Sequence, residues 1–166
     1  MQKIDYRKLS PGDRELFDAA KQARKRAHAH LSGFKVGAAA RFGETIVHGC
    51  NVESDVYGLT NCAERTAVFA AHAAGAAAKS LSAIAVVADT SEPVSPCGAC
   101  RQVLFEQGGP ELRVILANTR GDIALTTMAE LLPGGFRLAM RSATSPKPAR
   151  RKPAARKTSR QKPAKR

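Results

Sequence analysis

The sequence has no apolar run long enough to cross a lipid bilayer. Its longest apolar stretch, Ala67–Ala78, is 12 residues and is interrupted by His72 and Gly75, whereas a spanning helix needs about 20 apolar residues. The charged N-terminus is followed by neither an apolar segment nor a small-residue cleavage site, so no secretory signal is visible. We therefore expect a cytoplasmic protein with no membrane partner.

Acidic and aromatic residues are absent beyond Met140. Segment 141–166 holds 11 of the 27 basic residues, with Pro, Ala and Ser making up most of the rest and almost nothing to bury. The other 140 residues carry 16 basic and 14 acidic side chains, a net charge of +2. The composition predicts a near-neutral globular domain over 1–140 and a disordered basic tail over 141–166.

The tail has two readings. Its positive charge would release counterions from nucleic acid and so give binding that is indifferent to sequence. Without aromatic residues for stacking, recognition of particular bases or of single strands is not expected from the tail itself. The other reading is a solvated extension with no dedicated partner, and both readings stay open.

Helix and strand signals alternate along residues 1–140. Ser10 and Pro11 mark a helix start, as a capping residue and a first-turn proline. The expected helices cover 11–29, 62–74, 97–107 and 126–132, and the expected strands cover 34–41, 45–50, 82–88, 112–117 and 122–125. This alternation predicts an α/β fold, a three-layer α/β/α sandwich around a five-stranded mixed sheet.

Four cysteines stand at positions 50, 62, 97 and 100. In a reducing compartment such a cluster indicates metal binding or catalysis rather than disulfides. Cys62 opens one expected helix, and Cys97 and Cys100 open another; a helix N-terminus lowers the pKa of a thiol and favours the thiolate that binds metal. Three ligands leave tetrahedral zinc one open position, which is typical of a catalytic site. Thiolates also favour zinc over iron.

Glu64 follows Cys62 by two residues and can stand beside a zinc-activated water as a proton shuttle. Two alternatives remain: Cys62 is a buried apolar side chain and the other thiols are incidental, or Cys50 adds a fourth ligand and closes the site. The pairing of Cys-Ala-Glu with Pro-Cys-Gly-Ala-Cys matches the pattern of zinc deaminases. We therefore favour an open, catalytic zinc site.

At these residues the sequence resembles the cytidine deaminase family, specifically its small, homotetrameric nucleoside deaminases of pyrimidine salvage that hold zinc with three cysteines. The likeness runs from about Leu16 to Phe136. It is carried by Ser32-Gly33-Phe34-Lys35-Val36-Gly37-Ala38-Ala39, Gly49-Cys50-Asn51-Val52-Glu53, Tyr57-Gly58-Leu59-Thr60-Asn61-Cys62-Ala63-Glu64-Arg65-Thr66-Ala67, Ser95-Pro96-Cys97-Gly98-Ala99-Cys100-Arg101-Gln102-Val103, and Leu131-Leu132-Pro133 before Phe136.

The resemblance implies a function and a role for each matched residue. Cytidine or deoxycytidine would be hydrolysed to uridine or deoxyuridine plus ammonia, in a homotetramer with shared sites. Glu64 would take a proton from water and deliver protons to N3 and the departing amine. The other implied roles are Cys62, Cys97 and Cys100 on Zn2+, Arg65 offsetting the thiolate charge, Phe34 on the base, Asn51 and Glu53 on the ribose hydroxyls, Ala63 against the substrate, and Phe136 reaching into a neighbouring subunit's site.

Two departures from the family pattern bear on the substrate. His30-Leu31 stands where the family usually has Pro-Tyr, and Ser54-Asp55 where it typically has Asn-Ala. A new carboxylate beside the base pocket leaves open a modified cytosine nucleoside, such as a blasticidin-type antibiotic, as substrate. A nucleic-acid-tethered protein on a deaminase scaffold is the second alternative. Asn51 and Glu53, which suit a free sugar, favour a nucleoside, as does Cys62 where nucleic-acid-editing relatives usually have histidine.

Overall fold

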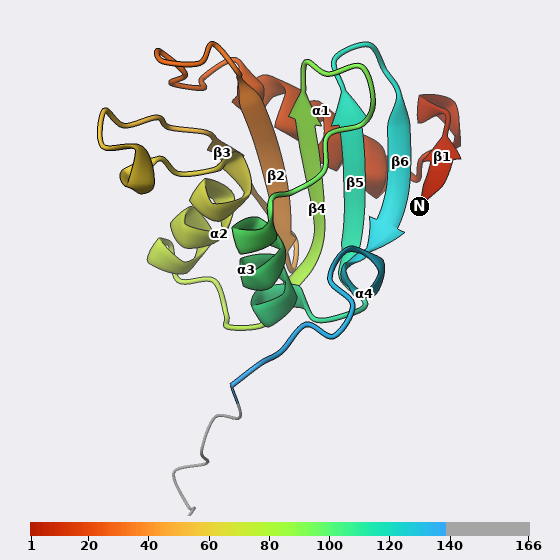
Figure 1. Ribbon diagram of the computed structural model, residues 1–166. Coiled ribbons are helices and arrows are strands. Elements are labelled where there is room, and N and C mark those ends of the chain that lie inside the picture. The colour runs from red at the N-terminus through yellow and green to blue at the C-terminus, as the bar shows by residue number, and fades with distance from the viewer. Residues whose placement is uncertain (139–166) are drawn as a thin grey trace, which may run out of the picture.

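A mixed β-sheet runs through the computed structural model, which describes residues 1–138 (Figure 1). The strands are β1 (Gln2–Ile4), β2 (Val36–Phe42), β3 (Thr45–Cys50), β4 (Leu81–Ala88), β5 (Arg113–Asn118) and β6 (Ile123–Thr127). The helices are α1 (Pro11–Arg24), α2 (Ala63–Ala73), α3 (Gly98–Gly108) and α4 (Met128–Leu131), with single 3-10 turns at Tyr6–Lys8 and Tyr57–Leu59. None of these helices is both long and apolar enough to cross a membrane. The predicted tail, 141–166, lies outside the described residues.

The sheet has the strand order β1-β6-β5-β4-β2-β3, with β4 and β5 parallel and every other pair antiparallel. Helix α1 covers one face, and α2 and α3 lie side by side on the other (Figure 1). The predicted α/β/α sandwich with a mixed sheet is therefore confirmed, but the sheet has six strands within the described residues rather than five.

The additional strand is β1, which sequence reasoning missed. Its three residues are exposed apart from the half-buried Ile4, so no alternation of apolar and polar residues announces it. It forms because the edge of β6 offers unpaired backbone groups, and Gln2 pairs with Leu125 and Ile4 with Ile123. Pairing with an edge strand is a long-range contact that local sequence cannot signal.

The first helix ends at Arg24 instead of continuing to residue 29 as predicted. Its start agrees with the prediction, since the Ser10 side chain accepts a hydrogen bond from the Asp13 N–H at 3.1 Å. Beyond Arg24 the chain leaves the helix because His28 pairs with the segment after β3. The His28 N–H donates to the Asn51 carbonyl at 3.0 Å, and the Glu53 N–H donates to the His28 carbonyl at 2.8 Å. Tertiary pairing thus overrides the helical preference of these residues.

Small residues bring the helices close to the sheet. Along β2, Ala38 and Ala40 face the core under α2 and α3, whereas Ala39 faces the core under α1, as the two-residue period of a strand requires. A Cβ built on Gly49 in β3 would lie 2.2 Å from the Ala63 carbonyl oxygen and 2.4 Å from the Ala67 nitrogen. The N-terminal half of α2 therefore rests directly on the backbone of Gly49.

Replacing Gly49 with alanine is expected to lower the free energy of unfolding by about 1–3 kcal/mol, because α2 must move away from the sheet to admit the methyl group. Gly58→Ala is the matched control, since nothing lies within 4 Å of a Cβ at that position. Chemical denaturation of both variants measures the difference. Equal stability of the two would contradict the close packing of α2 on β3.

Candidate active site

Two helix N-termini meet on the same face of the sheet and bring three cysteines together. Cys62 is the N-cap of α2, Cys97 is the N-cap of α3, and Cys100 lies in the first turn of α3. Neither capping side chain accepts a hydrogen bond from its helix backbone, so both thiols are available to bind a metal. Cys50, the fourth cysteine, instead donates to the Arg26 carbonyl at 3.5 Å and does not belong to this group.

The three thiols fit a zinc ion. All three Sγ atoms lie within 4.8 Å of one another, and those of Cys62 and Cys97 are 3.9 Å apart. A tetrahedral zinc with Zn–S bonds of about 2.3 Å keeps its sulfur ligands roughly 3.8 Å apart. Three sulfur ligands would leave one coordination position of a tetrahedral zinc for a water or substrate atom.

Electrostatics at the thiols favour a thiolate at Cys62. A hydrogen bond from Cys100, together with those from Arg65 and Cys97, lowers the pKa of Cys62 to about 5 in spite of its partial burial. The same bond to Cys62, reinforced by burial, raises the pKa of Cys100. Zinc needs both groups as thiolates, so binding it displaces the proton that Cys100 retains.

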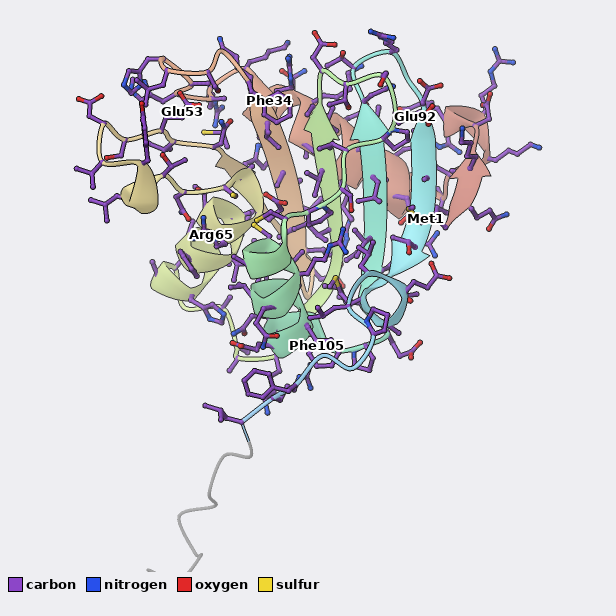
Figure 2. All side chains as sticks on the ribbon, viewed as in Figure 1. Met1, Phe34, Glu53, Arg65, Glu92 and Phe105 are labelled. Carbon is purple, nitrogen blue, oxygen red and sulfur yellow. The ribbon has the colours of Figure 1, made fainter. Side chains whose placement is uncertain are left out.

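Arg65 supplies the positive charge next to these thiols. Its guanidinium donates to Cys62 Sγ at 3.5 Å and to the Thr60 carbonyl at 3.2 Å. The contact with Cys62 raises the pKa of Arg65 further. The residue thus lies where the resemblance implied, against a metal ligand. Figure 2 labels it at the start of α2.

Glu64 is 4% exposed and lies in the first turn of α2. Burial raises the pKa of its carboxyl, and the negative charge of Cys62 adds to the shift. A carboxyl whose protonated form is favoured can hold a proton near neutral pH, as a group that both takes and gives protons must. Glu64 also lines the cavity next to Cys62 and Cys97.

A cavity of about 250 Å³ opens beside the thiols. The predicted residues that line it are Phe34, Asn51, Glu53, Cys62, Ala63, Glu64 and Cys97. Sequence reasoning missed the other lining residues, which are Val36, Thr60, Asn61, Val86, Val94 and Ser95. Thr60, Asn61 and Ser95 stand within two residues of a cysteine ligand in the quoted sequence blocks, and that proximity is the signal that could have found them.

The two sugar-binding candidates are already hydrogen-bonded to the chain. Asn51 is 7% exposed; its Nδ2 donates to the Phe34 carbonyl and its Oδ1 accepts from the Val36 N–H, each at 2.8 Å. Glu53 accepts from the Leu31 N–H at 2.7 Å and from the N–H and hydroxyl of Ser32. The Ser32 hydroxyl bond lowers the pKa of Glu53 and keeps it ionised. Figure 2 labels Phe34 and Glu53 at the same end of the molecule.

Of the residues singled out in the sequence, Cys100 and Arg65 lie next to the lining residue Cys62 without lining the cavity themselves. Phe136 and Asp55 do not line it either. Phe136 is 61% exposed, and its carbonyl accepts from Gln102 on α3 at 3.0 Å, which places it on the outside of the chain. Asp55 has a side chain that is 90% exposed and bonded to His30. Neither residue is part of the cavity wall of its own chain.

Arg101 braces the loop that carries Cys97, a role that sequence reasoning did not assign. Its guanidinium donates to the Pro96 carbonyl at 2.8 Å, to the Ser95 hydroxyl at 2.9 Å and to the Leu131 carbonyl at 2.7 Å. These bonds tie the residues just before Cys97 to α4. Because arginine presents several donors in a fixed plane, one side chain can hold three acceptors in place.

Comparison with known proteins places the fold and the site in a family. The model for the zinc-binding region of cytidine and deoxycytidylate deaminases matches residues 11–116. A cytidine deaminase from Sporosarcina psychrophila is 52% identical over 123 residues, covering 74% of this chain and 89% of that protein. A crystal structure of cytidine deaminase from Burkholderia pseudomallei is 50% identical with a TM-score of 0.73, covering 77% of this chain and all of that one.

A more distant structure agrees with these two. The crystal structure of cytidine deaminase from Mycobacterium tuberculosis is 39% identical with a TM-score of 0.65, and the likeness covers 78% of this chain and 100% of that one. The chain belongs to the cytidine and deoxycytidylate deaminase family. This membership confirms the predictions of zinc as cofactor and of zinc-dependent cytidine deamination as the activity. The roles of single residues stay predictions.

Replacing Arg101 with glutamine is expected to weaken zinc binding about tenfold, the lower end of the effect seen when groups that orient metal ligands are removed. Competition with a chromophoric zinc chelator measures the affinity without reference to turnover. Arg120→Gln is the control, because the Arg120 side chain makes no hydrogen bond within residues 1–138. Zinc affinity equal to that of the control would show that Arg101 does not support the ligand loop.

Proposed function

We propose that this chain deaminates free cytidine and deoxycytidine, with Glu64 as the group that moves the protons. The observation that carries the proposal is the buried Glu64 carboxyl in the wall of a cavity that also contains Cys62, Cys97 and the two polar residues Asn51 and Glu53. A cavity of about 250 Å³ with a metal-binding end and a hydrogen-bonding end suits a small polar ring joined to a sugar.

The residues divide the reaction among them. Zinc on Cys62, Cys97 and Cys100 supplies a Lewis acid that lowers the pKa of water. The Glu64 carboxylate accepts a proton from the attacking water, and the resulting acid donates to N3 of the base. The regenerated carboxylate takes the second proton from the new hydroxyl group at C4 and passes it to the amine, which leaves as ammonia while a carbonyl forms at C4. The raised pKa of Glu64 suits this alternation, because burial makes the protonated carboxyl easier to form than that of an exposed glutamate.

The remaining cavity residues orient the nucleoside. Phe34 lines the cavity with its ring 44% exposed, which leaves an aromatic surface for the base. Asn51 retains one Nδ2 proton and Glu53 retains acceptor capacity, so together they can donate to and accept from sugar hydroxyls. Ala63 is buried and adds a small apolar contact between the ligand Cys62 and Glu64.

A modified cytosine nucleoside is the weaker alternative. The argument for such a substrate was a carboxylate, that of Asp55, expected beside the base pocket. In the structure this carboxylate contacts His30 and is not part of the cavity wall. The second alternative, a protein tethered to nucleic acid, depends on segment 141–166, which lies outside the described residues. Binding of nucleic acid by that segment stays a prediction. The free nucleoside is therefore the substrate class we propose.

We also propose a homotetramer in the cytoplasm. The exposed apolar side chains of residues 1–138 include several that a second copy could cover, among them Val56, Tyr57, Leu59, Phe69 and Phe136. The four cysteines are free thiols, three of them grouped for a metal, which suits a reducing compartment.

Glu64→Gln is expected to lower kcat for cytidine by about 10²- to 10⁴-fold, since glutamine keeps the shape of the side chain but cannot transfer a proton. Ultraviolet absorbance follows the loss of cytidine and deoxycytidine, and elemental analysis verifies one zinc per chain in parent and variant. A zinc-loaded variant that turns over as fast as the parent would remove Glu64 from the reaction. A zinc-loaded parent that deaminates neither nucleoside would overturn the proposed substrate.

Phe136→Ala is expected to lower kcat/KM for cytidine about tenfold, because an aromatic contact from a neighbouring subunit is lost. Sedimentation of the parent should give four chains per particle. Hybrids of Phe136→Ala and Glu64→Gln chains provide the sharper test, because a hybrid can unite an intact Glu64 with an intact neighbouring Phe136. Activity of the hybrids no greater than the weighted sum of the two pure variants would contradict shared sites.

A further inference from the structure

Two loops beside the cavity are joined by a contact between a histidine and an aspartate side chain. His30 Nε2 lies 3.0 Å from Asp55 Oδ1. His30 belongs to the segment 28–34, which ends in Phe34, and Asp55 follows Glu53 after β3. These are the two positions at which the sequence departs from the family pattern, and the structure brings them into contact with each other.

The two segments are otherwise held together through His28, through Glu53 and through Asn51, whose Nδ2 donates to the Phe34 carbonyl at 2.8 Å. Backbone bonds of His28 with Asn51 and Glu53 fix the base of the contact. Farther along segment 28–34, the Glu53 carboxylate makes the contacts. Its Oε2 accepts from the Leu31 N–H at 2.7 Å and the Ser32 N–H at 3.2 Å, and its Oε1 accepts from the Ser32 hydroxyl. The Ser32 hydroxyl oxygen in turn accepts from the Phe34 N–H at 2.9 Å. The Phe34 N–H is therefore held through Ser32 and Glu53, whereas the Phe34 carbonyl is held by Asn51.

This arrangement gives Glu53 two competing tasks. A carboxylate has about four acceptor positions, and the loop takes three of those on Glu53. One position remains for a sugar hydroxyl. A substrate that draws more strongly on Glu53 weakens the bonds to Leu31 and Ser32, and with them the placement of Phe34 over the base. Between the bonds at His28 and at Phe34, residues Leu31 and Ser32 are bonded only to Glu53 across this contact, so this stretch needs an anchor that does not use Glu53.

We propose that the contact between His30 and Asp55 is that anchor, a clamp that keeps segment 28–34 against the cavity while Glu53 binds the sugar. Neither residue lines the cavity, so both act as positioning residues. The clamp rests on the proposed function, because it presumes that Glu53 and Phe34 contact the nucleoside. Its effect falls on substrate affinity, since it stabilises the binding-competent arrangement and touches none of the reacting atoms.

The size of the effect follows from the exposure of the pair. The side chain of His30 is 40% exposed and that of Asp55 is 90% exposed, so solvent weakens their attraction. Removing either partner is expected to raise KM for cytidine about two- to fivefold and to leave kcat unchanged. A larger change in KM accompanied by a fall in kcat would instead indicate damage to the site itself.

The test compares His30→Ala, Asp55→Ala and the double variant with the conservative Asp55→Asn. A clamp predicts the same rise in KM for both single variants and the double variant, because each removes the same contact. Asp55→Asn keeps an acceptor for the imidazole and should restore most of the affinity. Glu44→Ala and His48→Ala are matched controls, since both side chains are exposed and make no hydrogen bond within residues 1–138. Additive effects, or a KM unchanged in all clamp variants, would overturn the proposal.

Amide hydrogen exchange separates failure of the clamp from failure of the proposed function. The amides of Leu31 and Ser32 are bonded to Glu53 and should exchange two- to fivefold faster in Asp55→Ala than in Asp55→Asn or Glu44→Ala, with or without nucleoside. If the zinc-loaded parent does not deaminate cytidine, the proposed function fails and the exchange rates alone decide the clamp. Unchanged exchange in Asp55→Ala overturns the clamp whatever the substrate.

Discussion

The grouping of three thiols within 4.8 Å of one another depends on where α2 and α3 begin. Cys62 and Cys97 occupy capping positions that serine, threonine, asparagine or aspartate fill in most helices. The helices thus give up the usual capping bond, and their N-terminal charge is directed at the thiols instead. The contact of α2 with Gly49 and the bracing of the Cys97 loop by Arg101 bring the two ends to a common point. The position of the three thiols therefore depends on how α2 and α3 pack on the sheet and on α4.

Negative charge gathered at this point accounts for the behaviour of Glu64. Burial disfavours the ionised carboxylate, and a neighbouring thiolate at Cys62 disfavours it further. Arg65 offsets part of this charge through its contact with Cys62 and so limits the shift. A carboxyl whose pKa is raised in this way can accept a proton and pass it on. The thiols proposed to bind the metal thus also shift the pKa of the carboxyl proposed to move protons.

Sequence reasoning succeeded where the signal is local. The candidate ligand cysteines, Glu64 and the helix starts at Ser10, Cys62 and Cys97 are marked by residues at fixed short spacings; the structure groups the three thiols and begins the helices as expected, while the roles of the residues stay predictions. It failed where a distant segment decides the outcome. Strand β1 forms on the edge of β6, and α1 ends early because His28 pairs with the segment after β3. The contacts of Arg101 with Leu131 and of His30 with Asp55 join positions that no periodic pattern connects.

The deep and the outer parts of the cavity are held by different kinds of interaction. Cys62, Glu64 and Cys100 are fixed by helices packed on the sheet, where a change in one residue disturbs many contacts. Glu53, Ser32 and Phe34 are fixed by a few bonds between exposed loops, which individually contribute little and exchange readily with solvent. Substitutions at the rim can therefore alter how tightly a nucleoside is held without disturbing the metal or the proton transfer. The two departures from the family pattern at positions 30 and 55 lie in this outer part, where such variation costs the fold least.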